Sequence, residues 1–309
     1  MLSWCTFRGT GLVAILLALA GLCARPLSAQ QDHGANRGCR QDSRFKVPDH
    51  PMRAALAGTV DLSDDRSICS GALATLPGRP MSAKGLVLTA GHCVDAGSTR
   101  LGDHRYPGNN ETIRNLKQHR SLALHTREGP TLKACIETET LLYASMTGQD
   151  LAIYELAETF EEIASRTGVQ PFAISADRGA PGTGVRAPSG RWENERTCAI
   201  EAEVTLIREH VWRWGPLLRL TSGCTFRGGA SGSPVLRRDT STIVGVVGTV
   251  FGGGQPCEIH NPCEVDPAGQ TSVGRPGTSY AAAADVLVRC ADPAGRLDLT
   301  RPDCPLAKN

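Results

Sequence analysis

The chain has 309 residues, of which 40% are hydrophobic and 21% are charged, and its formal net charge is +2. This length and composition fit one large domain or two small ones. Because no basic cluster accompanies the small net charge, we expect neither a nucleic acid nor an anionic membrane as a partner. The 34 glycines, 19 prolines and low aromatic content of 5% favour many short strands and turns over long helices.

The N-terminus has the layout of a secretory signal peptide. Arg8 precedes an apolar run over 11–23, and small residues lead to a cleavage site after Ala29. The apolar run is about 13 residues, shorter than the ~20 that a membrane-spanning helix needs. Lipid attachment at Cys23 is another alternative, which the large Leu22 before it disfavours. We therefore expect an exported protein, secreted or periplasmic, with no membrane association after signal removal.

An even number of cysteines follows the predicted signal peptide. They are Cys39, Cys69, Cys93, Cys135, Cys198, Cys224, Cys257, Cys263, Cys290 and Cys304. In an exported chain this pattern predicts up to five disulfides, although spacing alone does not give the pairing. A metal site is the alternative, but no CxxC or histidine-rich pair accompanies these cysteines. We expect no metal and no cofactor.

Short apolar or alternating segments, separated by turn-forming residues, recur along the chain. In order they are AALAGTVDL (54–62), CSGALATL (69–76), GLVLTAGHCV (85–94), DLAIYELA (150–157), CAIEAEVTLI (198–207), PLLRLTSGC (216–224), SPVLRR (233–238) and STIVGVVGTVF (241–251). Such a series predicts an all-β barrel or sandwich.

Other segments interrupt this pattern. The stretch AETFEEIASR (157–166) favours a helix, and SYAAAADVLVRC (279–290) could contain a terminal one. The stretch rich in glycine and proline at 174–184 is expected to lead into a second strand-rich half. The long, polar and turn-rich region 251–277 is predicted to be a surface loop.

The motif GGASGSPV (228–235) contains a serine, Ser231, with Gly232 after it and the small Ala230 before it, and two further glycines precede Ala230. Such a sequence suits a tight turn that exposes the hydroxyl and lets backbone N–H groups converge. An ordinary turn between two strands is the alternative for this motif taken alone. A serine hydroxyl becomes a nucleophile when an imidazole takes its proton and a buried carboxylate holds that imidazole. His92, in LTAGHC (88–93), is the candidate base.

Asp150 is the candidate acid, because it leads directly into an alternating apolar strand. Asp95 and Asp103 lie too near His92 in the sequence to reach it easily from another strand. A plain loop aspartate is the alternative for Asp150. The order His, Asp, Ser is one of the known orders of a catalytic triad.

From about Arg44 to Cys290 the chain resembles the chymotrypsin-like (trypsin-fold) serine proteases. The resemblance rests on CSGALAT (69–75) with LTAGHC, on DLAIYEL (150–156), on GASGSPV (229–235), on STIVGVVGTVFGG (241–253) and on RPGTSYA (275–281). It implies an all-β fold of two antiparallel Greek-key β-barrels, with the active site in the cleft between them and a short C-terminal helix. The nucleophile motif is most similar to that of bacterial glutamyl-endopeptidase-like members.

The resemblance also implies a division of the chain. The parts are a signal peptide (1–29), an N-terminal segment (30–50), a first β-barrel (51–168), a second β-barrel with the C-terminal helix (169–290) and a C-terminal tail (291–309).

Carried over residue by residue, the resemblance makes Ser231 the nucleophile, His92 the general base and acid, and Asp150 the orienting carboxylate. The backbone N–H groups of Gly229 and Ser231 would form the oxyanion hole. A disulfide between Cys69 and Cys93 would hold the histidine loop.

Cys198, at the start of a strand that leads towards Cys224, is expected to pair with it. The pairs Cys39–Cys135, Cys257–Cys263 and Cys290–Cys304 complete the set by elimination and proximity.

Three departures from the family pattern bear on activation and specificity. Ala230 stands where digestive members have an aspartate that pairs with a newly cut N-terminus, so we expect no trypsin-style activation. No histidine occurs between Leu236 and Ile259, which leaves a preference for glutamate unsupported. The neutral Thr225 stands where trypsin-like members place an acidic pocket floor, which weakens a preference for Lys or Arg.

These observations predict a secreted serine endopeptidase, a monomer, that hydrolyses protein or peptide substrates through an acyl-enzyme intermediate. A catalytically silent binding protein with a protease fold is the alternative. A non-peptide acyl hydrolase is a more distant one, because the pattern lacks alternating strand–helix units.

Overall fold

The structure is a computed structural model that describes residues 39, 52–64, 66–129 and 131–307. The predicted signal peptide lies outside the described residues, as does the predicted N-terminal segment apart from Cys39. None of the helices in the described part has the length and apolar character that a membrane-spanning helix requires.

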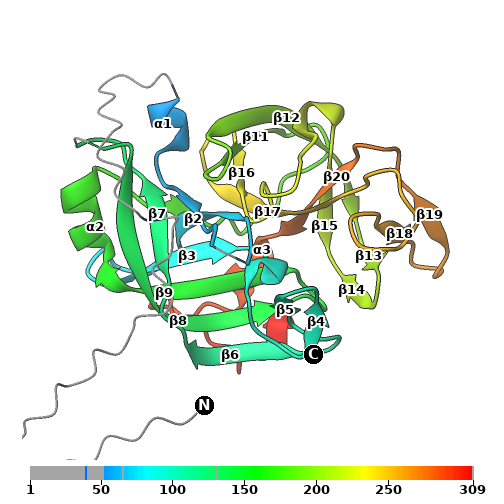
Figure 1. Ribbon diagram of the computed structural model, residues 1–309, viewed down its shortest axis with the longest axis horizontal. Helices are drawn as coiled ribbons and strands as arrows, with labels where there is room; N and C mark the ends of the chain where they lie inside the picture. The colour runs from blue at the N-terminus through cyan, green and yellow to red at the C-terminus, as the bar shows by residue number, and fades with distance from the viewer. Residues whose placement is uncertain (1–38, 40–51, 65, 130, 308–309) are drawn as a thin grey trace, which may run out of the picture. The chain divides into compact units, whose positions relative to one another are not determined.

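The first half of the described chain forms a closed ring of six antiparallel strands (Figure 1). In ring order they are β1 (Thr59–Asp61), β7 (Ser121–His125), β8 (Lys133–Ser145), β9 (Leu151–Thr159), β3 (Lys84–Thr89) and β2 (Ser70–Thr75), and β2 pairs back to β1. Strand β6 (Thr112–Lys117) extends the sheet beside β8, and β10 (Phe172–Ala173) pairs in parallel with β2. Apolar side chains such as Leu73, Val87 and Ile153 are almost fully buried in this barrel.

The second half forms another closed barrel of six strands. Its order is β11 (Gly184–Ser189), β12 (Asn194–Val204), β15 (Leu217–Leu220), β20 (Ser279–Ala283), β17 (Ile243–Val250) and β16 (Pro234–Arg237), all paired antiparallel. Its own buried cluster includes Val185, Leu218 and Val235. A short helix, α3 (Asp285–Arg289), follows β20. The predicted fold class, with two antiparallel barrels and a C-terminal helix, is confirmed.

Smaller elements surround the two barrels. They are a hairpin of β4 (Thr99–Leu101) and β5 (His104–Tyr106), a sheet of β14 (Trp212–Trp214), β13 (Leu206–Glu209), β18 (Cys263–Val265) and β19 (Thr271–Val273), the helices α1 (Arg53–Leu56) and α2 (Phe160–Thr167), and the 3-10 turns η2 (Gly91–Cys93), η3 (Ser222–Cys224) and η4 (Pro305–Ala307).

Helix α2 begins three residues later than the sequence predicts, because β9 continues to Thr159. The side chain of Thr159 accepts the N–H of Glu162, and Glu162 in turn accepts the N–H of Thr159. This reciprocal capping box fixes the start of the helix. Gly168, with φ at +68°, ends it in the left-handed conformation that glycine adopts readily.

Two predictions about the second half are wrong. The region 251–277 is not only a loop, because β18 and β19 form a hairpin there whose strand β18 pairs with β13. The segment 198–207 is not one strand, because β12 ends at Val204 and β13 begins at Leu206 in a different sheet. Both places meet in the pairing of β13 with β18, which joins segments that are distant in sequence, so local periodicity carries no signal for it.

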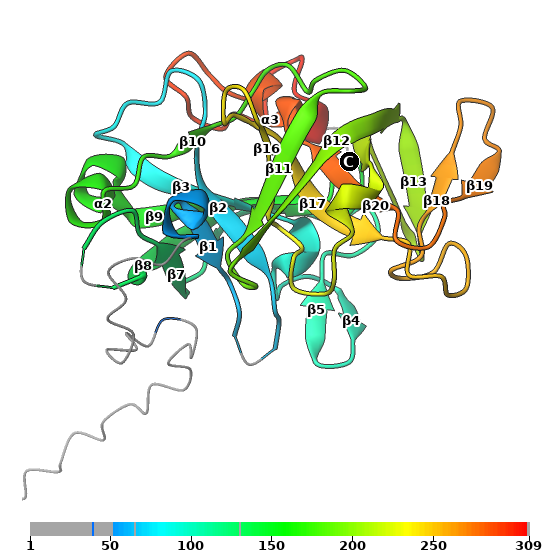
Figure 2. The ribbon, with the colours of Figure 1, turned by 90° about the horizontal axis from the view of Figure 1, so that it is seen from above.

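All five expected cysteine pairs are disulfide-bonded in the structure. They are Cys39–Cys135, Cys69–Cys93, Cys198–Cys224, Cys257–Cys263 and Cys290–Cys304. The Cys69–Cys93 bond joins the start of β2 to η2. The turn between β11 and β12 comes close to the first barrel, as β11 lies beside β1 (Figure 2).

Candidate active site

His92 lies in η2, directly after β3. Gly91 precedes it in a position that excludes any side chain, because a Cβ there would collide with the carbonyl oxygen of Ser145 on β8. The backbone N–H of His92 donates to Oδ1 of Asp150 at 2.9 Å, and its ring Nδ1 lies 2.7 Å from Oδ2. The residue is therefore fixed by main chain and side chain to the same carboxylate.

Asp150 immediately precedes β9, and its side chain is only 2% exposed. Its carboxylate accepts from the imidazole, so the Nδ1 position carries the hydrogen and Nε2 is left as the acceptor. Burial acts to lower the pKa of His92, but the charge and hydrogen bond of Asp150 outweigh it and raise that pKa above the ordinary value of 6.5. Asp150 thus fixes the orientation of His92, whose Nε2 can act as a base.

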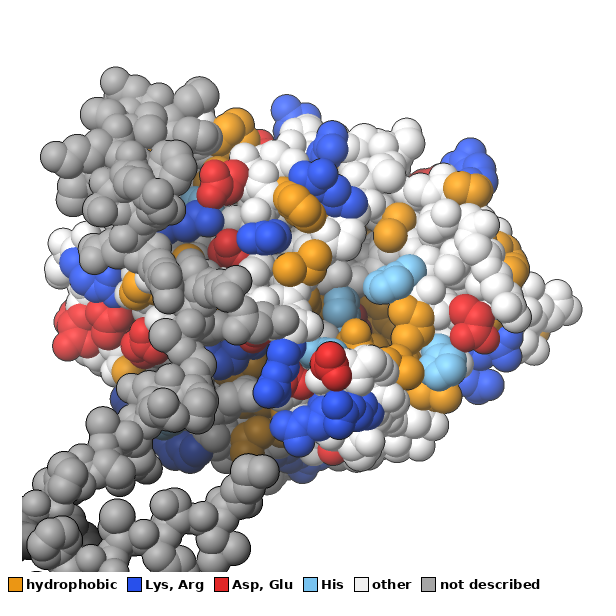
Figure 3. Space-filling view, in the orientation of Figure 1, with side chains coloured by type: hydrophobic (Ala, Val, Ile, Leu, Met, Phe, Trp, Pro, Cys, Tyr) orange, Lys and Arg blue, Asp and Glu red, His pale blue; other side chains and the backbone are white. Residues whose placement is uncertain are grey.

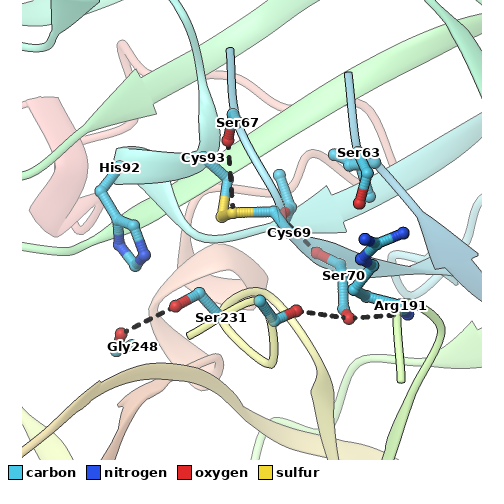
Figure 4. Close-up of a disulfide and its surroundings, with 12 residues drawn as sticks. Ser63, Ser67, Cys69, Ser70, His92, Cys93, Arg191, Ser231 and Gly248 are labelled. Atoms are coloured by element: carbon cyan, nitrogen blue, oxygen red, sulfur yellow. Dashed lines mark hydrogen bonds between the residues drawn. A yellow bond between two sulfur atoms is a disulfide. The ribbon is translucent and has the colours of Figure 1, made fainter. Parts of the chain in front are cut away.

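Ser231 lies in the loop before β16, with its hydroxyl 3.5 Å from the carbonyl oxygen of Gly248 on β17. A Cβ built on Gly248 would lie 3.3 Å from Oδ2 of Asp150. Gly248 is thus next to both the candidate acid and the candidate nucleophile. Among the described residues, no hydrogen bond joins Ser231 to His92, and the hydroxyl points to Gly248 (Figure 4).

A second connection between the two halves runs through β2. Cys69 is bonded to Cys93, the neighbour of His92, and the next residue, Ser70, donates its N–H to the carbonyl oxygen of Ser231 at 2.8 Å. Figure 4 shows His92, the disulfide and Ser231 around this point. Because Cys69 and Ser70 are adjacent, the disulfide and this hydrogen bond together link the position of His92 to that of Ser231.

The backbone around Ser231 leaves two amide hydrogens unused. Gly229 has φ at +93°, a left-handed conformation that a side chain disfavours. In the described part of the chain, neither the N–H of Gly229 nor that of Ser231 donates a hydrogen bond, whereas Ala230 between them donates to Arg227 at 3.1 Å. Two free donors beside the hydroxyl suit the binding of an oxyanion.

The side chains of Cys69, His92 and Cys93 bring three metal-ligating atoms within 4.8 Å of one another. They do not form a metal site. The two sulfurs are bonded to each other, and Nδ1 of His92 is engaged by Asp150. Thiolates, which bind metals, are not available in a disulfide.

Thr225, which stands at the position of the family's pocket floor, lies beside the segment 275–281. The hydroxyl of Thr225 donates to the carbonyl oxygen of Gly277 at 3.3 Å. Phe251 pairs with the same segment, since its N–H donates to Thr278 and its carbonyl oxygen accepts from Gly277. The exposed Thr225 contributes only a neutral hydroxyl to this region.

Sequence reasoning missed Glu209, a buried carboxylate near the candidate triad. Oε1 of Glu209 accepts from the hydroxyl of Thr249 at 2.9 Å and from the N–H of His260 at 2.6 Å. Burial raises the pKa of Glu209 to about 7, although both hydrogen bonds oppose the shift, and the charges of His92 and Asp150 act on it. Figure 3 shows histidine side chains beside apolar ones in the hollow of this face. Glu209 is the last residue of β13, two positions beyond the apolar segment 198–207, and no sequence motif marks it.

Comparisons with known proteins agree with this fold. A model of the trypsin-like peptidase domain matches residues 69–246. No curated protein sequence matches the chain. Similar solved structures include the MamO protease domain from Magnetospirillum magneticum in its apo form, with 14% identity, a TM-score of 0.44, and coverage of 79% of this chain and 97% of that one.

Two further structures are a Glu endopeptidase in complex with MPD and Protease A from Thermobifida fusca. The first has 14% identity and a TM-score of 0.43, and the match covers 78% of this chain and 90% of that chain. The second has 15% identity and a TM-score of 0.40, with 74% of this chain and 91% of that chain covered.

Proposed function

The chain belongs to the trypsin-like peptidase domain family, and on that premise we propose that it is a serine endopeptidase with Ser231, His92 and Asp150 as its catalytic triad. The observation that carries the proposal is the doubly bonded pair of His92 and Asp150, with Gly248, which accepts the hydroxyl of Ser231, so near to Asp150 that an added Cβ would lie 3.3 Å from Oδ2.

The proposed reaction begins when the hydroxyl of Ser231 turns from the carbonyl oxygen of Gly248 to Nε2 of His92. Catalytic hydrogen bonds are often long before substrate binds, so the weak bond of 3.5 Å to Gly248 is a resting position. Nε2 takes the proton while Oγ bonds to the carbonyl carbon of the substrate, whose π electrons move to its oxygen. Asp150 stabilises the imidazolium that forms.

The N–H groups of Gly229 and Ser231 then donate to the new oxyanion. When the carbonyl re-forms, the C–N bond breaks and His92 gives its proton to the leaving amine, which yields an acyl-enzyme on Ser231. A water molecule repeats the sequence, with His92 taking its proton, and releases the acid product. No metal or cofactor takes part in this scheme.

Protein or peptide substrates follow from the peptidase family, and we propose that the enzyme acts outside the cytoplasm as a monomer. The five disulfides support an oxidising compartment. The predicted cleavage after Ala29 supports export, to the periplasm or to the medium.

The second candidate function is a protease-fold binding protein without catalysis. The absence of a hydrogen bond between Ser231 and His92 in the described residues is the observation that favours it. The two functions differ in a peptide-library digest by wild type and by Ser231→Ala. The proposal expects cleavage by wild type alone, with the same unfolding midpoint for both proteins. Intact peptides with wild type, at a normal unfolding midpoint, would favour the binding protein.

A further inference from the structure

The loop that carries Ser231 is held from outside by its carbonyl oxygens. The indole Nε1–H of Trp192 donates to the carbonyl oxygen of Gly228 at 3.0 Å. The hydroxyl of Ser70 donates to the carbonyl oxygen of Gly229, also at 3.0 Å. Two consecutive carbonyls, immediately before the candidate nucleophile, are therefore tied to other parts of the fold.

The first of these bonds fixes the direction of an amide hydrogen. In a trans peptide the C=O and the following N–H point in opposite directions. Because Trp192 draws the carbonyl of Gly228 towards itself, the N–H of Gly229 points away from the indole. That N–H is one of the two donors that remain unused in the described part of the chain.

The direction of the Gly229 N–H depends on a hydrogen bond from outside the loop. Gly228 and Gly229 both lack a Cβ, so rotation of the peptide between them meets little steric resistance. A rotated peptide would present the carbonyl oxygen of Gly228 where an oxyanion needs a donor. The residue that follows, Ala230, is buried and has no charged group with which to hold the loop.

Trp192 is itself held firmly. The guanidinium of Arg227 lies over its ring, 3.5 Å from the centroid, a cation–π contact. The backbone N–H of Trp192 donates to the hydroxyl of Ser189 at 3.3 Å, and that hydroxyl lies 2.9 Å from the hydroxyl of Ser70.

The turn that carries Trp192, between β11 and β12, is tied to the first barrel. The hydroxyl of Ser70 accepts the N–H of Arg191 at 3.1 Å, and Nε2 of His125, on β7, lies 2.9 Å from the carbonyl oxygen of Gly190. Burial, followed by the nearby Lys133, lowers the pKa of His125 to about 4, which keeps it neutral near pH 7. The indole is thus presented from a fixed turn.

We propose that Trp192 is a positioning residue that keeps the Gly229 N–H aimed at the oxyanion site, and that Ser70 supports it by holding the next carbonyl of the same loop, that of Gly229. This inference rests on the proposed function. It assigns to the β11–β12 turn the task that a buried salt bridge next to the nucleophile would otherwise perform.

The test compares wild type with Trp192→Phe, which keeps the ring but loses the N–H. One net hydrogen bond corresponds to about 3- to 10-fold, so kcat is expected to fall by about that factor while KM changes less than about twofold. A peptide aldehyde, whose hemiacetal with Ser231 places an oxyanion in the site, is expected to bind more weakly by the same factor. The matching peptide alcohol, which forms no oxyanion, is expected to bind equally well to both proteins.

A second variant, Ser70→Ala, removes the other hold and is expected to act in the same direction, with a larger loss in the double variant. The unfolding midpoint of each variant separates a folding defect from a positioning one. Equal kcat and equal aldehyde affinity for wild type and Trp192→Phe would overturn the inference while leaving the proposed function intact. A wild type that neither cleaves peptides nor binds the aldehyde would overturn both.

Discussion

The two sides of the candidate active site are built in different ways. On the first barrel, the backbone and the ring of His92 both bond to the buried Asp150. On the second barrel, the carbonyl oxygens of Gly228 and Gly229 accept hydrogen bonds from other parts of the fold, whereas the N–H groups of Gly229 and Ser231 donate to no described residue. The orientation of the base is thus fixed by direct bonds to Asp150, whereas two donors beside Ser231 have no partner within the described residues.

This difference separates two requirements of one reaction. A base must keep one tautomer and one orientation through the whole cycle, so permanent bonds serve it. An oxyanion exists only in the transition state and the intermediates, so its donors must be fixed in place yet unused before the reaction. The following predictions test whether each side depends on its own kind of support.

The largest effect is expected from Asp150→Asn, which removes the charge that supports His92. We expect kcat to fall about 10⁴-fold, because Asn favours the wrong tautomer. Burial acts to lower the pKa of His92, and Asp150 raises it. Loss of the Asp150 charge should therefore lower the pKa of His92. The acidic limb of the pH–kcat/KM profile should therefore move to lower pH.

Asp103→Asn serves as the control for this variant, since the side chain of Asp103 is 94% exposed. Its profile should match that of wild type. An Asp150→Asn enzyme with unchanged kcat would remove Asp150 from the triad.

Gly229→Ala tests the other side. Its φ of +93° is strained for alanine, and the new Cβ would lie 3.0 Å from Nε1 of Trp192. If this strain turns the N–H of residue 229 away from the oxyanion, one donor is lost and kcat should fall about 10²–10³-fold. The matched control is Gly182→Ala, at φ +91° with no atom within 4 Å of the new Cβ.

Both glycine variants should lose about 1 kcal/mol of stability, from the same backbone strain. Only the variant at Gly229 should lose turnover. Similar kcat values for the two variants would show that the Gly229 N–H does not contact the oxyanion.

Removal of the Cys69–Cys93 disulfide should disturb both sides, because it holds the histidine and is followed directly by Ser70. The variant Cys69→Ala/Cys93→Ala opens a loop with a sequence separation of 24, which should cost about 3 kcal/mol of stability. The measurements are the free energy of unfolding in urea and kcat, and both should be lower than in wild type.

The comparison is Cys290→Ala/Cys304→Ala, which opens a loop with a separation of 14 behind α3. It should cost a similar amount, about 3 kcal/mol, and leave kcat at the wild-type value below the unfolding temperature. An equal loss of kcat in both double variants would mean that the first disulfide has no special link to the site.

The smallest effect is expected from Glu209→Gln, and it appears only as a pH dependence. The carboxyl ionises near 4.5 in the unfolded chain and near 7 in the folded one, so the folded state binds more protons between these values. The contribution of Glu209 to stability should therefore fall as the pH rises from 4.5 to about 7, by at most about 3 kcal/mol, and then level off, whereas His125, whose pKa is lowered to about 4, contributes in the opposite direction. The free energy of unfolding of the variant, measured with urea at several pH values, should lack this contribution.

Glu128→Gln, at an exposed position, is the control and should keep the slope of wild type. The same dependence of stability on pH in wild type and Glu209→Gln would contradict the raised pKa of Glu209.

The sequence marks the candidate catalytic side chains by local motifs, but it does not mark the residues that support them. The motifs around His92 and Ser231 are short and local, because each residue lies in a tight turn whose glycines are its neighbours in the sequence. The barrels follow from alternating apolar segments, and the disulfides from an even number of cysteines in an exported chain. The motifs and the apolar segments lie within about ten residues of the feature that they predict, whereas the cysteine count is a property of the whole chain.

The supports depend on partners that are far apart in the sequence. Trp192 is 36 residues from Gly228, and Ser70 is 159 residues from Gly229. Strand β18 pairs with the distant β13 and, on its other side, with β19, so a polar, turn-rich sequence becomes a hairpin. Glu209 is an ordinary strand-end glutamate until the fold buries it. Such features arise from tertiary contacts, which local patterns do not encode.

The most direct test of the proposed triad is the reaction of the folded protein with a fluorophosphonate, followed by mass spectrometry of its peptides. The account predicts one adduct, on Ser231, which forms far more slowly in Asp150→Asn and is absent from Ser231→Ala. Folded wild-type protein without an adduct, or cleavage of peptides by Ser231→Ala at the wild-type rate, would contradict it.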